Sequence, residues 1–347
     1  MGEVNVIYRT RLWQTTDGEV WSKADELYMD RCFQLARIAE GKTSPNPLVG
    51  AVVVCDGKII GEGFHHKAGE PHAEPNAINS VADKEMLKRA TLYVSLEPCS
   101  HYGKTPPCAD LIIHMGIPRV VVATLDPNPL VAGRGIKMMR EAGIDVKIGC
   151  MESEALRLNR RFFTFQMFRR PYVVLKWAQT ADGFIDKFRQ TAEGGPVKIS
   201  NAITKTLNHK MRTEEDAIMV ATRTAVLDNP HLTITKWSGR NPVRILLDKT
   251  LKVPKDYKIF DGSAKTIIFT EKKGNGYGKN VEFEVIDFRG DVYSQVLERL
   301  YERNILSVII EGGAQWLQTV IDSGVWDEAH IETGEISLGN GIVAPKL

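Results

Sequence analysis

The first half of the chain alternates between short apolar runs and amphipathic stretches, a pattern that predicts strands interleaved with helices. A helix is expected from residue 26 to Gly41, because its apolar residues recur at the spacing of one helix face. The apolar runs 49–55 and 58–64 flank Asp56-Gly57 and predict a β-hairpin closed by a two-residue turn. Further helices are expected to begin near residue 72 and to span 108–115 and 136–142, and further strands to span 91–96, 119–124 and 145–149.

The pattern restarts after Pro171 and again predicts strands separated by helices. Between the halves, the stretch 152–168 is helical in pattern but basic and aromatic. We expect a solvated linker helix there rather than a nucleic-acid surface, because no wider basic field accompanies it. Strands are expected at 172–178, 216–221, 243–248, 266–270, 281–286 and 305–310, and helices at 202–211 and 293–302.

These patterns predict an α/β protein with two domains. The expected organisation is an N-terminal extension over residues 1–25 without an assignable role, a first domain over 26–150, a linker helix over 151–170 and a second domain over 171–347. A chain of 347 residues is long for one domain and comfortable for two.

Composition and charge are those of an ordinary globular protein, with 43% hydrophobic and 25% charged residues. A formal net charge of +2 gives no indication of a nucleic-acid or membrane partner. The sequence shows neither a transmembrane run nor a signal peptide, so we expect a cytoplasmic protein. Its 5 cysteines, an odd number without regular spacing, argue against a disulfide framework.

A candidate metal centre lies in the first half. His72-Ala73-Glu74 is followed by Pro98-Cys99 and, after an insert, by Cys108. One imidazole and two thiolates form a ligand set that zinc favours, and three protein ligands leave the fourth position for a water. Zinc can lower the pKa of that water to about 7, and Glu74 is placed to move a proton between the water and a departing amine. We therefore expect hydrolytic deamination of an amino-heterocycle.

Taken singly, these residues have a plainer interpretation as a surface histidine, a solvated glutamate and two buried thiols. Their combination, His-x-Glu followed by Pro-Cys and a second Cys, is typical of zinc deaminases. One alternative within this class is a nucleoside or tRNA deaminase with an unrelated C-terminal domain. Another, outside the class, is a non-catalytic nucleotide-binding regulator built on an inactive deaminase fold.

The segment from Cys99 to Cys108, Cys-Ser-His-Tyr-Gly-Lys-Thr-Pro-Pro-Cys, resembles the signature of the bifunctional deaminase/reductase family of riboflavin biosynthesis. Cytidine and tRNA deaminases usually have Pro-Cys-x-x-Cys instead. The resemblance runs from about residue 26 to the C-terminus. Other motifs similar to that family are Ser44-Pro45-Asn46-Pro47, Asp126-Pro127-Asn128-Pro129, Gly133-Arg134-Gly135, Lys176-Trp177-Ala178-Gln179-Thr180-Ala181-Asp182-Gly183, Thr224-Ala225-Val226-Leu227-Asp228 and Glu311-Gly312-Gly313.

The resemblance implies a cytidine-deaminase-like three-layer domain followed by a dihydrofolate-reductase-like domain, with Zn²⁺ and NADPH as cofactors. The first domain would deaminate 2,5-diamino-6-ribosylamino-4(3H)-pyrimidinone 5′-phosphate. The second would reduce the product, 5-amino-6-(5-phosphoribosylamino)uracil, to its ribitylamino form. The partners implied are these small phosphorylated pyrimidines and other copies of the chain in a homo-oligomer.

Roles in the first site follow from the motif and from the resemblance. His72, Cys99 and Cys108 are expected to bind zinc, with Glu74 as the catalytic proton shuttle. His65 also has a plainer interpretation, as a surface residue beside His66. The resemblance assigns substrate binding in this domain to Asn46, His65, Lys104, Asp126 and Asn128.

In the second domain, Arg212 is the candidate for gripping the substrate phosphate as a bidentate fork, and the alternative is a solvent-facing helix residue. Gly312-Gly313 lies at a strand–helix junction where backbone amides can approach a phosphate, although such a pair is often only a tight turn. The sequence identifies no general acid for the hydride step. The resemblance assigns the NADPH site to Ala178, Thr224, Asp228, Gly312 and Gly313, and the substrate site to Arg212, Leu232 and Glu311.

Two positions in the second domain depart from the family pattern. The stretch Pro196-Val197-Lys198-Ile199-Ser200 stands where relatives commonly have Ser-x-Trp-Ile-Ser/Thr, so Lys198 replaces a tryptophan. Arg223 adds a side chain where relatives are often smaller, and it is a candidate contact for the 2′-phosphate of NADPH. Loss of the reductase activity alone is therefore a further alternative.

Overall fold

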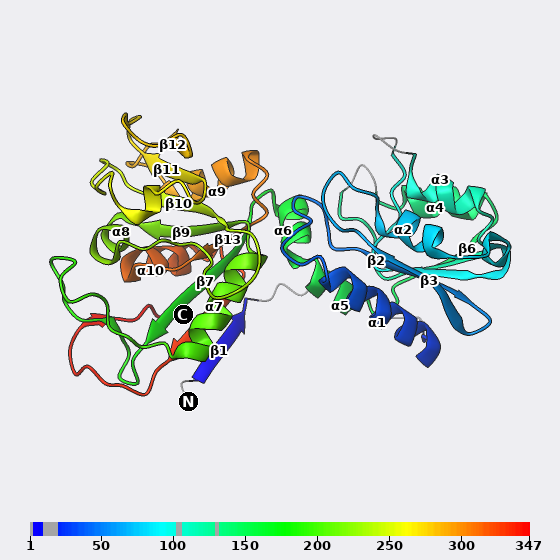
Figure 1. Ribbon diagram of the computed structural model, residues 1–347, viewed down its shortest axis with the longest axis horizontal. Helices are drawn as coiled ribbons and strands as arrows, with labels where there is room; N and C mark the ends of the chain where they lie inside the picture. The colour runs from blue at the N-terminus through cyan, green and yellow to red at the C-terminus, as the bar shows by residue number, and fades with distance from the viewer. Residues whose placement is uncertain (1–2, 10–19, 102–105, 129–131) are drawn as a thin grey trace. The chain divides into compact units, whose positions relative to one another are not determined.

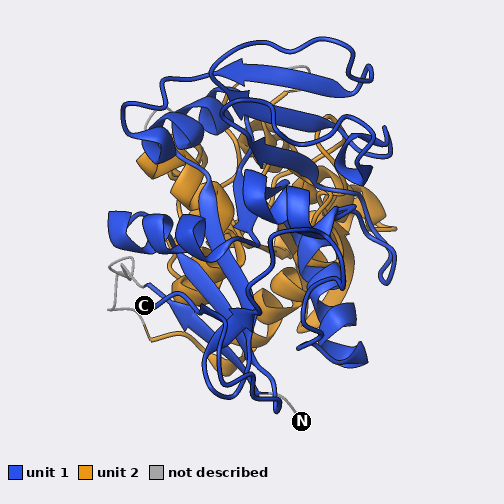
Figure 2. Cartoon of the chain, turned by 90° about the vertical axis from the view of Figure 1, so that its left-hand side faces the viewer, with its two compact units in different colours: residues 1–11, 169–347 blue, residues 12–168 orange. Residues whose placement is uncertain are grey.

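The computed structural model describes residues 3–9, 20–101, 106–128 and 132–347 (Figure 1). The chain divides into two compact units, which Figure 2 colours separately. Unit 2 comprises residues 12–168, and unit 1 comprises residues 169–347 together with 1–11. Each unit has its own central β-sheet and its own apolar cores.

Unit 2 is built on a five-stranded sheet in the order β3-β2-β4-β5-β6. Strand β2 runs antiparallel to β3 and β4, whereas β4, β5 and β6 are parallel. Every strand predicted in this half is present, close to its expected bounds. The strands are β2 (Gly50–Cys55), β3 (Lys58–Phe64), β4 (Thr91–Val94), β5 (Arg119–Val122) and β6 (Asp145–Ile148).

The predicted hairpin between β2 and β3 is confirmed. Asp56 has φ 51° and Gly57 has φ 72°, so both turn residues adopt the left-handed conformation that a tight two-residue turn requires. The pair Asp-Gly suits this turn because glycine adopts positive φ freely and aspartate tolerates it.

Unit 2 has three layers, because both faces of its sheet are buried. In β2, Ala51 and Val53 belong to the apolar cluster beneath α2, α3 and α4, whereas Val52 and Val54 belong to the cluster beneath α1 and α5. Successive residues of a strand point to opposite faces, so one strand serves both cores. The helices of unit 2 are α1 (Lys23–Arg37), α2 (Ala73–Ser80), α3 (Cys108–His114), α4 (Arg134–Glu141), α5 (Glu152–Leu158) and α6 (Arg160–Phe168), with a 3-10 turn at Lys84–Arg89.

The first helix begins earlier than its apolar pattern predicts. Helix α1 starts at Lys23, where the Ser22 side chain caps it by accepting a hydrogen bond from the Asp25 N–H at 3.1 Å. Leu27 is 65% exposed and does not belong to the buried stripe. The boundary expected at residue 26 therefore lies inside the helix, because a capping serine and a polar first turn carry no apolar periodicity.

The stretch expected to be one linker helix forms two helices, α5 and α6, and both belong to unit 2. They are separated at Asn159, whose buried side chain accepts a hydrogen bond from the Leu48 N–H at 2.8 Å and donates one to the Leu48 carbonyl at 2.9 Å. Ala155 and Leu158 pack into the cluster beneath α1. The stretch is thus part of a folded domain rather than solvated along its length.

Unit 1 is built on an eight-stranded sheet in the order β1-β14-β7-β13-β9-β10-β11-β12, with a separate β8–β15 pair. All neighbours in the large sheet are parallel except β1, which is antiparallel to β14. The strands are β1 (Glu3–Tyr8), β7 (Tyr172–Gln179), β8 (Phe184–Asp186), β9 (Ala217–Ala221), β10 (Val243–Leu247), β11 (Thr266–Thr270), β12 (Val281–Val285), β13 (Ser307–Ile310), β14 (Glu328–Thr333) and β15 (Ile342–Val343).

Helices cover both faces of this sheet. Apolar residues of α9 and α10 pack with Leu175 and Met219 on one face, whereas Ile218 and Val220 face the opposite cluster, which includes Ala225 of α8. Alternate residues of β9 therefore reach different cores, as in unit 2. The helices are α7 (Ala202–Glu214), α8 (Thr222–Asp228), α9 (Val292–Glu302) and α10 (Ala314–Ser323), with a 3-10 turn at Lys258–Phe260.

Part of the expected N-terminal extension is an edge strand of the unit 1 sheet, because β1 pairs along its whole length with β14. All six of its residues are exposed. The strand is held by its backbone ladder rather than by a buried side-chain face, so its sequence shows no distinctive pattern. Among the residues that the structure describes, no helix combines the length and the apolar composition needed to cross a bilayer.

Candidate functional sites

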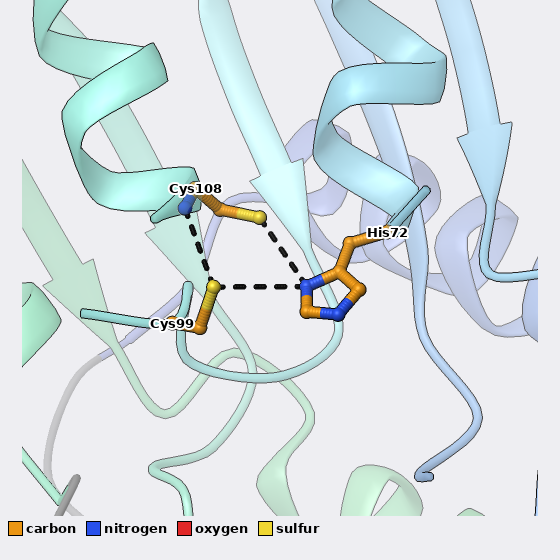
Figure 3. A group of neighbouring side chains, drawn as sticks. All are labelled: His72, Cys99 and Cys108. Atoms are coloured by element: carbon orange, nitrogen blue, oxygen red, sulfur yellow. Dashed lines mark hydrogen bonds between the residues drawn. The ribbon is translucent and has the colours of Figure 1, made fainter. Parts of the chain in front are cut away.

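Three potential metal ligands meet in unit 2 (Figure 3). The ligand atoms of His72, Cys99 and Cys108 all lie within 4.8 Å of one another. His72 Nδ1 is 3.6 Å from Cys99 Sγ and 3.4 Å from Cys108 Sγ. In a tetrahedral zinc site with Zn–S of about 2.3 Å and Zn–N of about 2.0 Å, the N···S edges are about 3.5 Å. The donor set and its spacing therefore fit zinc.

Two helix starts and one loop bring these ligands together. His72 is the N-cap of α2 and Cys108 is the first residue of α3, whereas Cys99 follows β4 in a loop. The backbone N–H of Cys108 donates a hydrogen bond to Cys99 Sγ at 3.3 Å. Hydrogen bonding from the Cys108 thiol and from His72 lowers the pKa of Cys99, which favours the thiolate that a metal needs.

Glu74 lies in the first turn of α2, as its spacing from His72 predicted, and only 3% of it is exposed. Burial raises the pKa of its carboxyl to about 7. Glu74 interacts with the side chain of Cys108, so its carboxyl adjoins the ligand cluster without belonging to it. The site therefore combines three ligand atoms with one buried acid–base group.

His65 is buried, and its ring lies 5.3 Å from the ring of His72, so it is not a surface side chain. Its Nε2 is 3.0 Å from Nδ2 of Asn46, and its Nδ1 is 3.1 Å from the Pro71 carbonyl oxygen. Burial lowers the pKa of His65, which favours the neutral ring. Two of the substrate-binding residues expected from the resemblance are thus adjacent beside the metal ligands.

Asp126 and Asn128 also lie together, because Asp126 Oδ1 accepts a hydrogen bond from the Asn128 N–H at 2.8 Å. Burial raises the pKa of Asp126, against the effect of this hydrogen bond. Lys104, the remaining residue expected at this substrate site, lies outside the described residues.

Unit 1 contains a large cavity of about 1030 Å³. It lies where β9 and β13 end and where α8 and α10 begin, the edge at which parallel α/β sheets bind ligands. Its lining includes every residue expected at the NADPH site, together with Glu311 and the departing residue Lys198. These expected residues are Ala178, Thr224, Asp228, Gly312 and Gly313.

The two glycines lie close to α8. A Cβ atom on Gly312 would be 3.3 Å from Thr224 Oγ1, and one on Gly313 would be 3.0 Å from the same atom. Gly313 is also the N-cap of α10. The pair therefore lets the backbone at the start of a helix approach Thr224 and the cavity more closely than residues with side chains would allow.

Arg212 does not present a free fork in this structure. Its Nε and Nη2 donate hydrogen bonds to the two carboxylate oxygens of Glu311 at 2.9 and 2.6 Å, and its Nη1 donates one to the Thr233 carbonyl at 3.3 Å. Leu232 is 3% exposed and packs in the apolar core rather than lining the cavity. Arg212 and Glu311 thus form one unit, and the side chain of Leu232 is separate from it.

Lys176 is a cavity residue to which the sequence assigned no role. It lies on β7 beside Glu311 and Arg212, and burial lowers its pKa. The available signal was a single lysine inside the apolar strand Tyr172–Gln179. A partly buried lysine with a lowered pKa is a candidate acid–base group.

Arg189 is a second cavity residue to which the sequence assigned no role. Its guanidinium pairs with Asp186 and Asp228, so it fixes the carboxylate expected to contact NADPH. The Arg189 carbonyl in turn accepts a hydrogen bond from Arg223 Nη2 at 3.0 Å. Arg223 lines both the large cavity and an adjoining hollow of about 680 Å³, which is also lined by Lys249 and other polar residues.

Two protein families match the chain. Residues 22–124 match the cytidine and deoxycytidylate deaminase zinc-binding region, and residues 171–345 match the RibD C-terminal domain. The first match contains all three ligands of the cluster and Glu74, and the second contains all the residues that line the unit 1 cavity.

Similar proteins extend over nearly the whole chain. Riboflavin biosynthesis protein RibD of Aquifex aeolicus is 42% identical over 322 residues, which cover 92% of this chain and 89% of that protein. RibD of Escherichia coli is 35% identical, with 93% and 88% coverage. The crystal structure of a diaminohydroxyphosphoribosylaminopyrimidine deaminase/5-amino-6-(5-phosphoribosylamino)uracil reductase from Thermotoga maritima is similar with a TM-score of 0.84 at 40% identity, covering 92% of this chain and 89% of that one. The expected cytidine-deaminase-like and dihydrofolate-reductase-like folds are thereby confirmed.

Proposed function

This chain belongs to the riboflavin biosynthesis protein RibD family, and we propose that it catalyses a deamination in unit 2 followed by a reduction in unit 1. The deamination converts 2,5-diamino-6-ribosylamino-4(3H)-pyrimidinone 5′-phosphate to 5-amino-6-(5-phosphoribosylamino)uracil. The reduction uses NADPH to convert the ribosyl group of that product to ribityl. The observation that carries the proposal is the cluster of one imidazole nitrogen and two sulfur atoms within 4.8 Å of one another, beside a buried glutamate.

In unit 2, His72, Cys99 and Cys108 hold zinc, which acts when bound as a Lewis acid that makes a water nucleophilic near neutral pH. Glu74 takes a proton from the attacking water and delivers it to the exocyclic amine. The amine leaves as ammonia, and the water oxygen stays on the pyrimidine ring. Burial of Glu74 keeps bulk water away from this proton path.

Other residues of unit 2 hold the substrate. Asn46 and His65 lie beside the ligands and present an amide and a neutral imidazole, groups that read the edge of a heterocycle. Asp126, Asn128 and Lys104 complete the set, with Lys104 neutralising the phosphate.

In unit 1, NADPH supplies a hydride when it is bound, and the protein supplies alignment and a proton. Lys176 donates its proton to the ribose ring oxygen, which becomes a hydroxyl as the neighbouring carbon accepts the hydride. Burial makes the Lys176 ammonium more acidic, while the adjacent Glu311 keeps it charged until the reaction.

The remaining residues of unit 1 position the two reactants. Ala178, Thr224, Asp228 and Gly312-Gly313 line the NADPH site. The paired side chains of Arg212 and Glu311 face the substrate, and Leu232 supports that end of the site from the core.

The substrates are small phosphorylated pyrimidines, and the protein acts as a homo-oligomer in the cytoplasm. The homo-oligomer is inferred from the family resemblance, and the cytoplasmic location from the apolar pattern and the cysteine usage of the sequence. Light scattering of the purified protein tests the oligomer, and a strictly monomeric mass at assay concentration would contradict it.

The direct test of function combines metal analysis with two assays on purified protein. We expect about one zinc per chain, ammonia release from the diaminopyrimidine substrate, and oxidation of NADPH when the deaminated product is supplied. Zinc-replete protein without ammonia release would contradict the deaminase assignment. Failure to oxidise both NADPH and NADH would contradict the reductase assignment and favour loss of that activity through Lys198.

A further inference from the structure

One buried carboxylate in unit 2 joins two segments of the deaminase site. Glu97, two residues before Cys99, is 4% exposed. Its Oε2 accepts hydrogen bonds from the N–H groups of Asp126 at 3.2 Å and Gly133 at 2.9 Å. Its Oε1 accepts hydrogen bonds from the N–H groups of Gly135 at 3.0 Å and Ile136 at 3.4 Å. One side chain thus satisfies four backbone donors from another segment.

The backbone beside Glu97 makes further contacts with the same region. The Glu97 N–H donates a hydrogen bond to the Thr124 carbonyl at 3.0 Å. A Cβ atom on Gly135 would lie 2.2 Å from the Pro98 carbonyl oxygen, so the start of α4 packs directly against the residue that precedes Cys99. Glycine at position 135 is therefore required by this close approach.

We propose that Glu97 is a positioning residue that fixes the segment bearing Asp126 and Asn128 relative to the metal ligands, and so sets where the substrate is held. The inference rests on the proposed deaminase function, in which Asp126 and Asn128 contact substrate. Glu97 itself touches neither the ligand cluster nor, in this assignment, the reacting atoms. Its effect is carried by the backbone N–H groups that it holds.

The chemistry requires a carboxylate at this position. Each oxygen of Glu97 receives two N–H donors, and both oxygens are acceptors only. Glutamine has the same shape but replaces one oxygen by an NH₂ group, which would face two backbone donors. Those two buried N–H groups would lose their acceptor, and the segment would move to find other partners.

The test measures the deamination kinetics of Glu97→Gln against those of Glu62→Gln. Glu62 is a matched control, because it pairs with Arg31 on the surface of the same unit. For Glu97→Gln we expect KM for the diaminopyrimidine substrate to rise about tenfold or more, with kcat changed less than about threefold. Zinc content and NADPH oxidation by the same preparation should stay at wild-type values, which shows that the protein is folded.

A second variant, Gly135→Ala, keeps Glu97 but separates α4 from Pro98, and it should raise KM in the same way. This variant decides the question if Glu97→Gln does not fold. Unchanged KM in the folded variants would overturn the proposal. Loss of zinc or of kcat at unchanged KM would also overturn it, because Glu97 would then support the metal loop alone. If the wild-type protein released no ammonia, the proposed deaminase function would fail, and this inference with it.

Discussion

The candidate sites of the two units are built differently. In unit 2 the reacting groups are few, and three ligand atoms lie within 4.8 Å of one another. In unit 1 the site is a cavity of about 1030 Å³ whose lining runs from Lys176 to Ile342. A metal accepts few residue types in a narrow geometry, whereas a cofactor cleft is shaped by backbone and by many side chains. Chemistry is therefore concentrated in short motifs in unit 2 and dispersed in unit 1.

The largest expected effect comes from removing the proposed proton shuttle of unit 2. Glu74→Gln should lower the deamination rate by on the order of 10³-fold or more, because the amide cannot move a proton between water and amine. Zinc should remain bound, since Glu74 is not one of the three ligands. Ammonia release and metal analysis check this, and loss of zinc in the variant would count against the shuttle role.

The next prediction removes a zinc ligand and tests whether the two activities are independent of each other. Cys108→Ser should weaken zinc binding by at least about 100-fold and reduce deamination with it, because a hydroxyl is a poor replacement for a thiolate ligand. The cavity of unit 1 contains no part of this cluster, so NADPH oxidation with pre-deaminated substrate should persist. Equal loss of both activities would show that the two sites are not independent.

A comparable test in unit 1 asks whether a dispersed site also depends on one proton donor. Lys176→Met should lower the reduction rate by about 100-fold while deamination is unchanged. Lys272→Met, in an exposed loop, is the matched control. A reduction rate near wild type would assign the proton to another group.

The proposed role of Lys176 also predicts how the reduction rate depends on pH. Burial lowers the pKa of Lys176, and only the ammonium form, which predominates below that pKa, can donate a proton. The reduction rate should therefore fall as pH rises, and the fall should begin below the ordinary lysine value of 10.5. A rate of the chemical step that stays flat up to that pH would contradict the assignment.

A smaller effect is expected where several groups share one task. Arg223 is oriented by its hydrogen bond to the Arg189 carbonyl and lines the hollow beside the main cavity. Arg223→Ala should raise KM for NADPH about tenfold and leave KM for NADH nearly unchanged, if this side chain meets the 2′-phosphate. Arg289→Ala, whose side chain is exposed, serves as the control. Equal changes for both cofactors would exclude that role.

The last prediction concerns stability rather than chemistry. Asn159→Ala would leave the buried Leu48 N–H and carbonyl groups without their partner and should destabilise unit 2 by roughly 2–4 kcal/mol. On heating, deamination should be lost at a lower temperature than in the wild type, while NADPH oxidation should be lost at the same temperature as before. Equal shifts in both activities would show that the units unfold together.

Much of the fold was predictable, because most of its strands are buried on both faces and read as apolar runs. The hairpin at Asp56-Gly57 was predictable from local turn chemistry. Strand β1 was not, since its side chains are exposed and it is held by hydrogen bonds to a strand more than 300 residues away in sequence. The break at Asn159 was also hidden, because its partner Leu48 is distant in sequence.

The same division applies to the sites. His72, Glu74, Cys99 and Cys108 could be grouped from sequence because zinc chemistry requires those residue types together. The pairing of Arg212 with Glu311 could not, because an arginine alone gives no sign of which anion it meets. The sequence shows Lys176 only as a lysine within a strand, and the fold places it beside Glu311 in the cavity.

By itself the sequence determined the metal-donor types, the turn at Asp56-Gly57 and the strands of the unit 2 sheet, since each depends on neighbouring residues or on the identity of a side chain. Only the tertiary structure decided that Glu97 holds four backbone N–H groups and that Arg212 is already paired. It also decided which polar groups are buried. Burial and long-range hydrogen bonding depend on residues that only folding brings together, and these interactions shift pKa values and position substrates.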